Sequence, residues 1–482
     1  MTRPVDNRGL HTMSTAAAPS TRDKALAFNL DRTTYGTFAE IGAGQEVARW
    51  FFAVGGAAGT VAKSISAYDM AVSDSFYGPA QRYVSRQRLE AMLGSEFDQL
   101  VLRLGPARGG TTKFFAFADT VAARSHANPR NGRGWIGIRF QAHPLDGPSD
   151  VIVHVHLLDS TAVGQQEALG VLGVNLVHAA AFHHDEPAVL VGCLMDELSR
   201  QRIEIDMIKL SGPAFAAVDN RLMSLQLVEQ NLTDAAMFTA AGEVVQPSET
   251  LYKRPILVVR GSFRPPTRVT LDLLERARAL FLEEPEVREH APMVLAEMTL
   301  RTLAGGAGVD HADFLARADI LGALGIDVLI SRFRPYYELA DYLAAYTDRM
   351  IGIAVGLPSI DEIVDEKYYK DLSGGVLESL GRLFKRSVKM YVYPMRDPAS
   401  GALVTVEDAA LPGPWVHLGR LLLETQLIVP IRAYTEAYLT IQTPDVLARI
   451  QRGDPTWETM VTPAVADLIR TKKLFGCQGG AR

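Results

Sequence analysis

Short apolar runs alternate with amphipathic segments along the chain from about residue 200 to residue 397. The runs are rich in β-branched side chains, which is typical of strands covered on both faces. They are Ile203–Leu210, Ala235–Phe238, Ile256–Val259, Val294–Met298, Val328–Ile330, Ile351–Val355 and Met390–Tyr393. The helical spacing between them is clearest at Leu271–Phe281, Ala312–Leu324 and Tyr336–Tyr346. This alternation predicts parallel strands joined by helical crossovers, and therefore a Rossmann-like α/β domain over residues 200–397.

The pattern differs on either side of this domain. Residues 1–29 are rich in Ala, Ser, Thr and Arg and lack an apolar core, which predicts a flexible tail. Residues 30–199 are expected to form an N-terminal α+β domain, because three of their segments are strand-like. These segments are Phe114–Phe117, Trp135–Phe140 and Val151–Leu157. Residues 398–482 are mostly helical in pattern and predict a C-terminal helical appendage.

Charge, hydropathy and cysteine content exclude several classes of protein and partner. The 482 residues carry a formal net charge of −6 and show no basic stripe interleaved with aromatic residues, so nucleic acid is not an expected partner. The longest apolar stretch, Ala168–Phe182, is too short to span a bilayer, and no membrane association is expected. With only two cysteines, Cys193 and Cys477, the chain has no disulfide framework and fits a reducing cytoplasm.

A sharp turn joins the predicted strand at Ile256–Val259 to its helix. Gly261 permits an unusual backbone conformation, and Pro265 and the proline after it keep the helix from starting earlier. Thr267 is then placed as the N-cap. Such a turn directs free backbone N–H groups and the positive end of the helix dipole above the strand, where an anion can bind. The residues predict a phosphate site with added charge from Arg264; an ordinary turn with surface arginines is the alternative.

The same turn, Gly-Ser-Phe-Arg-Pro at residues 261–265, resembles the opening of nucleotidyltransferases of the nicotinate-nucleotide and pantetheine-phosphate adenylyltransferase type. In that family a Gly-Ser-Phe-Asp-Pro turn leads into a His-x-Gly-His motif whose imidazoles hold the ATP phosphates. Here Thr267 and Thr270 stand at the two histidine positions. Val269 replaces the glycine, and Arg264 replaces the aspartate. The resemblance covers one strand and one helix, and implies a Rossmann-like fold with a nucleotide pocket from which the expected catalytic groups are missing.

A second turn follows the predicted strand at Val328–Ile330. The resembled enzymes also use a serine- and arginine-bearing turn late in the fold to contact nucleotide phosphates, and Ser331 and Arg332 are similar to it. ATP with Mg²⁺ is the cofactor that the resemblance implies, and no catalytic or metal-ligating residue is assigned. The predicted nucleotide-binding residues are Gly261, Ser262, Arg264, Thr267, Thr270, Ser331 and Arg332.

Two functions follow from these residues. One is a nucleotide-binding protein with adenylyltransferase-like activity on a phosphorylated metabolite. The other is a noncatalytic scaffolding or regulatory protein that retains the fold and assembles, as a homo-oligomer, through its terminal regions. Adenylyl transfer needs positioned donors or cations around the phosphates. Threonine hydroxyls cannot replace the charge of a protonated histidine, so the sequence leaves the choice between enzyme and scaffold open.

Two further segments of the N-terminal half carry candidate motifs. The segment Tyr35–Glu46 resembles one shared by a group of bacterial proteins of unsettled function, and its glycines do not complete a dinucleotide fingerprint. His154 and His156 are two residues apart on a predicted strand and therefore point to one face, a spacing that can hold a metal ion. Without a fixed third ligand, hydrogen-bonded structural histidines are the favoured interpretation, and a metal site remains the alternative.

Overall fold

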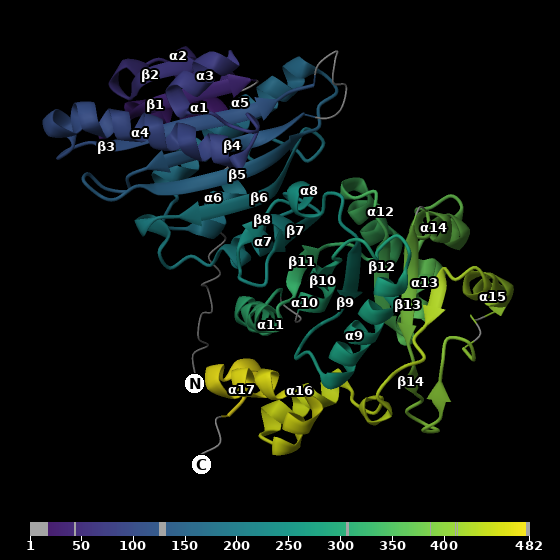
Figure 1. The fold of residues 1–482 in the computed structure, drawn as a ribbon. Coiled ribbons are helices and arrows are strands. Elements are labelled where there is room, and N and C mark those ends of the chain that lie inside the picture. The colour runs from purple at the N-terminus through teal and green to yellow at the C-terminus, as the bar shows by residue number, and fades with distance from the viewer. Residues whose placement is uncertain are drawn as a thin grey trace, which may run out of the picture. The chain divides into compact units, whose positions relative to one another are not determined.

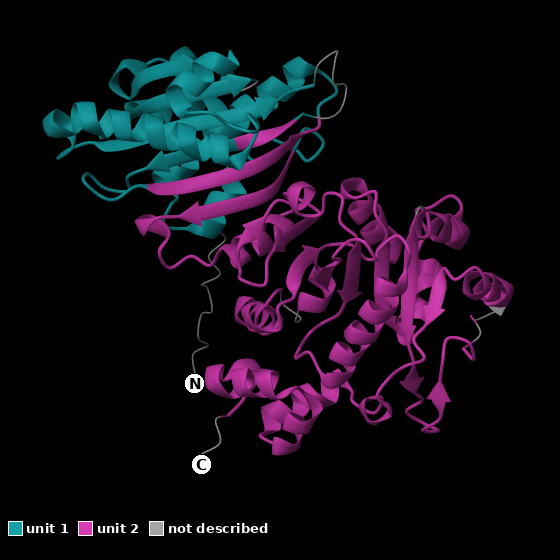
Figure 2. Ribbon diagram, viewed as in Figure 1, with its two compact units in different colours: residues 1–132, 136–148, 159–203 teal, residues 133–135, 149–158, 204–482 magenta. Residues whose placement is uncertain are grey.

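The computed structural model describes residues 18–42, 45–124, 132–304, 308–385, 387–409, 411 and 413–478. The chain forms two compact units, shown in different colours in Figure 2. Unit 1 comprises residues 1–132, 136–148 and 159–203, and unit 2 comprises residues 133–135, 149–158 and 204–482. Most of the expected tail, residues 1–17, lies outside the described residues, as do residues 43–44 of the Tyr35–Glu46 segment.

The first half of the chain contains six α-helices and six strands among the described residues. The helices are α1 (Thr21–Leu30), α2 (Glu46–Val54), α3 (Met70–Tyr77), α4 (Arg86–Arg108), α5 (Ala162–Phe182) and α6 (Pro187–Cys193). The strands are β1 (Thr34–Gly42), β2 (Val61–Ser66), β3 (Lys113–Ala122), β4 (Gly132–Phe140), β5 (Ser149–Leu157) and β6 (Ile203–Ser211). They follow the order β2-β1-β3-β4-β5-β6 in one sheet, which confirms the three strands predicted in this region.

Helix α1 lies within the segment that composition predicts to be a flexible tail. Ser20 caps the helix, and its buried side includes Ala25 and Phe28. The ammonium group of Lys24, only 1% exposed, forms a 2.5 Å ion pair with Asp196. The tail interpretation is therefore wrong for residues 21–29. It relied on residue types, whereas the buried side of the helix combines polar residues such as Lys24 with Ala25 and Phe28.

The second half contains eleven α-helices and ten strands among its described residues. The strands are β7 (Ala235–Phe238), β8 (Val244–Val245), β9 (Ile256–Arg260), β10 (Met293–Thr299), β11 (Asp327–Ser331), β12 (Ile351–Gly356), β13 (Val388–Tyr393), β14 (Met395–Arg396), β15 (Leu403–Val404) and β16 (Ile428–Pro430). The helices are α7 (Asn220–Glu229), α8 (Pro247–Thr250), α9 (Arg268–Glu283), α10 (Leu300–Leu303), α11 (His311–Ala323), α12 (Tyr336–Tyr346), α13 (Pro358–Ile363), α14 (Gly375–Leu383), α15 (Val416–Glu424), α16 (Thr443–Arg452) and α17 (Pro463–Lys472).

The second sheet has the order β16-β13-β12-β9-β10-β11-β7-β8 (Figure 1). From β16 to β11 every neighbouring pair is parallel, which confirms the Rossmann-like fold and the central position of β9. Three expectations need correction. Strand β7 pairs with β11 in the antiparallel direction, β6 joins the first sheet, and β16 extends the parallel sheet from a region expected to be helical. An apolar run predicts a strand but specifies neither its direction nor its neighbours.

Alternate residues of the parallel strands are buried under different helices. Val258 and Ile353 belong to a core cluster that includes Leu339 and Leu343 of α12. On the opposite face, Phe281 of α9 lies in edge contact with Tyr391 of β13, with ring centroids 6.1 Å apart. Because both faces are covered by helices, the strands are continuous apolar runs rather than alternating ones.

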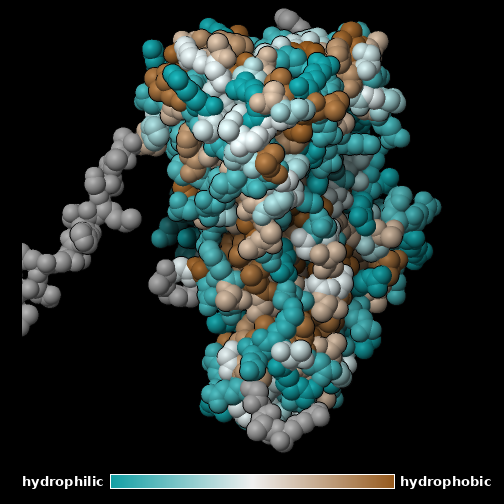
Figure 3. Space-filling model, turned by 90° about the vertical axis from the view of Figure 1, so that its left-hand side faces the viewer, coloured by the Kyte–Doolittle hydropathy of each residue, from teal (hydrophilic) through white to brown (hydrophobic). Residues whose placement is uncertain are grey.

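The end of the chain is helical, as predicted. Helices α16 and α17 share a small core in which Val446, Trp457 and Ile469 are buried together with Ile320 of α11. Among the described residues, no helix combines the length and the apolar character needed to cross a membrane. Figure 3 shows hydrophobic and hydrophilic residues intermingled over one face of the molecule.

Candidate functional site

The turn between β9 and α9 lies where the strand order of the parallel sheet reverses. The chain passes from β9 outward through β10 to β11, and then returns to β12 on the other side of β9. In open α/β sheets, ligands bind outside the carboxyl ends of the strands at such a point. The structure therefore places residues 261–267 at the position that this fold uses for ligands.

Local contacts shape this turn. The backbone N–H of Gly261 donates to the carbonyl of Glu297 at 3.1 Å, and a side chain at 261 would meet the ring of Phe263 at 3.1 Å. Phe263 itself is buried and has a positive φ of 50°. Helix α9 then begins with Thr267 as its N-cap, as predicted, and the Thr267 hydroxyl accepts from the backbone N–H of Thr270. Thr267 is fully buried, so its hydroxyl serves the helix start.

Arg264 is held by a carboxylate of helix α11. Its Nε donates to Oδ1 of Asp313 at 2.6 Å, and Oδ2 of Asp313 accepts from Nε of Arg317 at the same distance. Arg317 also donates to the carbonyl of Ser262 at 3.0 Å, and this bond ties the turn to helix α11. The Arg264 side chain remains 38% exposed. The guanidinium is thus oriented by Asp313 and still reaches solvent.

Beneath the turn lies a buried ion pair that the sequence analysis missed. Arg260 donates from Nε and Nη2 to the two carboxylate oxygens of Glu297, at 2.8 and 2.9 Å. Ser331, predicted as a nucleotide ligand, donates to Oε1 of Glu297 at 2.6 Å. Burial lowers the pKa of Arg260, but the adjacent carboxylate outweighs it and raises the pKa above its ordinary value. A glutamate inside the apolar run of β10 was the signal that could have indicated this pair.

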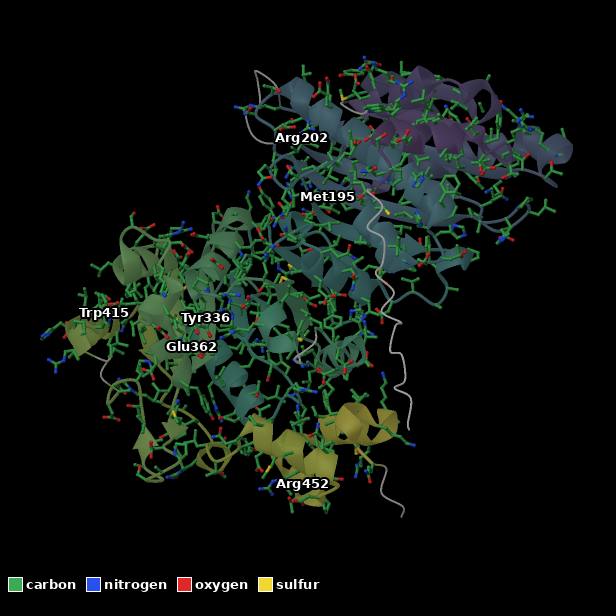
Figure 4. The ribbon with its side chains drawn as sticks, turned by 180° about the vertical axis from the view of Figure 1, so that it is seen from behind. Met195, Arg202, Tyr336, Glu362, Trp415 and Arg452 are labelled. Carbon is green, nitrogen blue, oxygen red and sulfur yellow. The ribbon has the colours of Figure 1, made fainter. Side chains whose placement is uncertain are left out.

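The ring of Tyr336 packs against the guanidinium of Arg260. Its centroid lies 4.4 Å from Cζ of Arg260, a cation–π contact. Figure 4 shows Tyr336 and Glu362 near each other, and the phenol is also hydrogen-bonded to Ser359. Burial raises the pKa of Tyr336, so the phenol is protonated at neutral pH. Polar side chains from several parallel strands and their following helices therefore meet at one edge of the sheet.

The predicted ligands form separate groups. Ser262 and Arg264 are joined through helix α11, whereas Thr267 and Thr270 contact each other, with their hydroxyl oxygens 3.2 Å apart. Arg332 lies in a different set of contacts, with Asn231 and with Asp234, whose Oδ1 is 3.9 Å from its Nε. Each predicted residue thus takes part in a hydrogen bond within the protein. Nucleotide binding by these residues stays a prediction.

Comparison with protein-family models and with curated protein sequences finds no match. Among solved structures, the competence/damage-inducible protein CihA from Agrobacterium tumefaciens is 15% identical, with 34% of this chain and 98% of that chain covered and a TM-score of 0.24. A CinA-superfamily protein from Enterobacter cloacae is 13% identical, with 38% and 99% covered and a TM-score of 0.25. A Vibrio parahaemolyticus protein provisionally described as a nicotinate-nucleotide adenylyltransferase is 15% identical, with 47% and 99% covered and a TM-score of 0.25. Likeness at this level carries no functional argument, so function must be inferred from the chain's own geometry.

Proposed function

We propose that unit 2 binds the phosphates of a nucleotide at the turn between β9 and α9, without efficient adenylyl transfer. The observation that carries this proposal is the position of the turn at the carboxyl ends of parallel strands where the strand order reverses. In the first turn of α9, the N–H groups of Arg268 and Val269 have no carbonyl partner within the helix and provide donors for an anion, whereas that of Thr270 donates to Thr267. Arg264 adds a cation that is partly exposed.

The same geometry argues against rapid chemistry. Thr267 is buried as a helix cap, and its hydroxyl carries no charge toward a phosphate. The charge of Arg264 is offset by Asp313 at 2.6 Å. Stabilising a transferring phosphoryl group needs preorganised positive charge at the reacting oxygens. We therefore assign binding of ATP, alone or with Mg²⁺, as the property of this site and treat turnover as absent or very slow.

Isothermal titration of the full chain with ATP, with and without Mg²⁺, tests the proposal. Arg264→Ala should weaken binding by about 1.5–3 kcal/mol, or roughly 10- to 150-fold, if its guanidinium donates a charged hydrogen bond to phosphate. Arg276→Ala is the matched control, because Arg276 is also 38% exposed and paired with an aspartate of α9, Asp272. Equal affinity in wild type and Arg264→Ala would remove Arg264 from the site.

A noncatalytic scaffold is the second candidate, and one observation favours it. The Arg260–Glu297–Ser331 contacts and the Arg264–Asp313 pair satisfy these side chains without a ligand. Such a protein would show no ATP binding in the titration. Light scattering of the same sample would then report whether the chain assembles with itself.

A further inference from the structure

Three polar side chains meet on strands β5 and β6 of unit 2. His154 and His156 project from the same face of β5, because they are two residues apart on a strand. Asp206 of β6 contacts both: its Oδ1 lies 2.6 Å from Nδ1 of His154, and its Oδ2 lies 2.9 Å from Nε2 of His156. One ligand atom from each of the three residues lies within 4.8 Å of the other two.

This cluster is buried and supported by its neighbours. The His154 and Asp206 side chains are 4% and 2% exposed, and His156 is 18% exposed, so one side of the cluster reaches solvent. Gln246 donates from Nε2 to Oδ2 of Asp206 at 2.9 Å, and this orients the carboxylate. The ring of Trp135 packs edge-on against His154, with centroids 4.8 Å apart. The support resembles the outer shell that fixes ligands around protein-bound metals.

Asp206 is a buried carboxylate that faces two imidazoles at hydrogen-bond distance. The two nearby phenols, Tyr342 and Tyr346, have pKa values raised by burial and are uncharged at neutral pH. A buried carboxylate in this setting is neutralised by an imidazolium or by a metal ion.

We propose that His154 Nδ1, His156 Nε2 and a carboxylate oxygen of Asp206 bind a divalent transition-metal ion of the zinc class. Two imidazole nitrogens and one carboxylate oxygen form a ligand set typical of zinc sites that keep a coordination position open. That open position faces the solvent side at His156. Hard ions such as Mg²⁺, which prefer oxygen ligands, fit this set poorly. The site shares no residue with the turn after β9 and stands independently of the proposed nucleotide site.

Metal binding changes the proton balance of the cluster. The two ring nitrogens now hydrogen-bond Asp206, and each needs a free lone pair to become a ligand. A neutral imidazole meets this need by carrying its proton on the other ring nitrogen, whereas an imidazolium must release one proton. Gln246 continues to donate to Asp206 and acts as a positioning residue.

The test uses the full chain, stripped with chelator and titrated with Zn²⁺, and with Co²⁺ as a spectroscopic probe. We expect one Zn²⁺ per chain, and visible Co²⁺ absorption bands of a tetrahedral or five-coordinate site. His156→Ala and Asp206→Asn should abolish both signals. Gln246→Ala should weaken binding by about 10- to 100-fold while leaving the stoichiometry unchanged. Mg²⁺ should not compete.

His143→Ala is the matched control. His143 also pairs with an aspartate, with Nδ1 3.2 Å from Oδ2 of Asp146, but it is exposed and, among the described residues, belongs to no group of three candidate ligands. Its variant should retain full Zn²⁺ and Co²⁺ binding. Because Asp206→Asn could unfold the sheet, His156→Gln gives a milder second variant whose fold is checked by circular dichroism. Absence of stoichiometric Zn²⁺ binding in the wild type, or equal binding by folded His156→Gln, would overturn the proposal and leave a hydrogen-bonded histidine pair.

Discussion

Two carboxyl groups lie side by side in the first sheet, although no sequence pattern singled them out. Glu40 of β1 stands opposite Asp119 of β3, and both are buried, with 2% and 0% of their surface exposed. Burial raises the pKa of Glu40 to about 7, despite a hydrogen bond from the N–H of Ala48 at the start of α2. Burial and the charge of Glu40 raise the pKa of Asp119 well above its usual value. Two adjacent buried carboxyl groups cannot both ionise readily.

Glu40→Gln should therefore stabilise the protein at alkaline pH. Below the ordinary glutamate pKa of 4.5, Glu40 is protonated in both the folded and unfolded states and has no effect. Between pH 4.5 and about 7 the unfolded state ionises first, so the free energy of unfolding falls, and above pH 7 the loss is constant. The variant should gain up to about 3 kcal/mol at about pH 8 and little at about pH 4, measured by urea unfolding.

Glu90→Gln, at a half-exposed position of α4, is the control for this measurement. Its effect should be small at either pH, because an exposed ion pair contributes at most about 1 kcal/mol. A Glu40→Gln variant with the same pH profile as wild type would show that Glu40 titrates normally.

The ion pair between Arg260 and Glu297 supports a second residue-scale prediction. Glu297 is 0% exposed, so Glu297→Ala would leave a buried guanidinium without its carboxylate. The expected loss in the free energy of unfolding is about 3–5 kcal/mol. Replacing both partners, Arg260→Met with Glu297→Leu, should recover much of that loss, because no unpaired charge remains. A double variant as unstable as Glu297→Ala would show that packing, not charge, sets the cost.

At the scale of elements, apolar periodicity in the sequence predicted the type and the position of several strands and helices. Strands β7 and β9 and helix α12 begin where the pattern placed them, because burial on both faces leaves an unbroken apolar run and burial on one face leaves a helical stripe. Strand direction and partner are long-range properties, and the antiparallel pairing of β7 and the sheet membership of β6 were not predictable in this way. Strand β16 was missed because it has only three residues.

Helix α9 offers the sharpest test of element packing. Phe281 is fully buried against the sheet, where it contacts the ring of Tyr391 of β13, and a side chain on Gly352 of β12 would meet it at 3.0 Å. Phe281→Ala should lower the free energy of unfolding by about 3–5 kcal/mol. Leu282→Ala, one residue along and 37% exposed, is the control and should cost much less. Equal losses in the two denaturant titrations would contradict the assignment of this face of α9.

At the scale of the whole molecule, the sequence located one candidate site and only part of a second. The turn after β9 was predictable because its glycine, its prolines and its N-cap all lie within residues 261–267. His154 and His156 were visible as a pair, but Asp206 lies 50 residues beyond His156 and meets it only through folding. Gln246, a further 40 residues on, gave no signal at all. A site built from residues close together in the chain can be predicted from sequence. A site whose residues are brought together only by folding cannot.

Adenylyl transfer should be absent or very slow in this protein. The resembled enzymes place histidines where this chain has Thr267 and Thr270, and Thr267 is buried as the cap of α9. Losing one preorganised transition-state contact costs about 3–4 kcal/mol, or roughly a hundredfold to a thousandfold in rate, and two contacts are missing. Arg264 cannot substitute fully, because Asp313 neutralises it at 2.6 Å. With ATP, Mg²⁺ and either nicotinate mononucleotide or pantetheine phosphate, pyrophosphate release should stay at background even where titration shows ATP bound. Robust, Mg²⁺-dependent release that Thr270→Ala abolishes would contradict this and establish the chain as an adenylyltransferase.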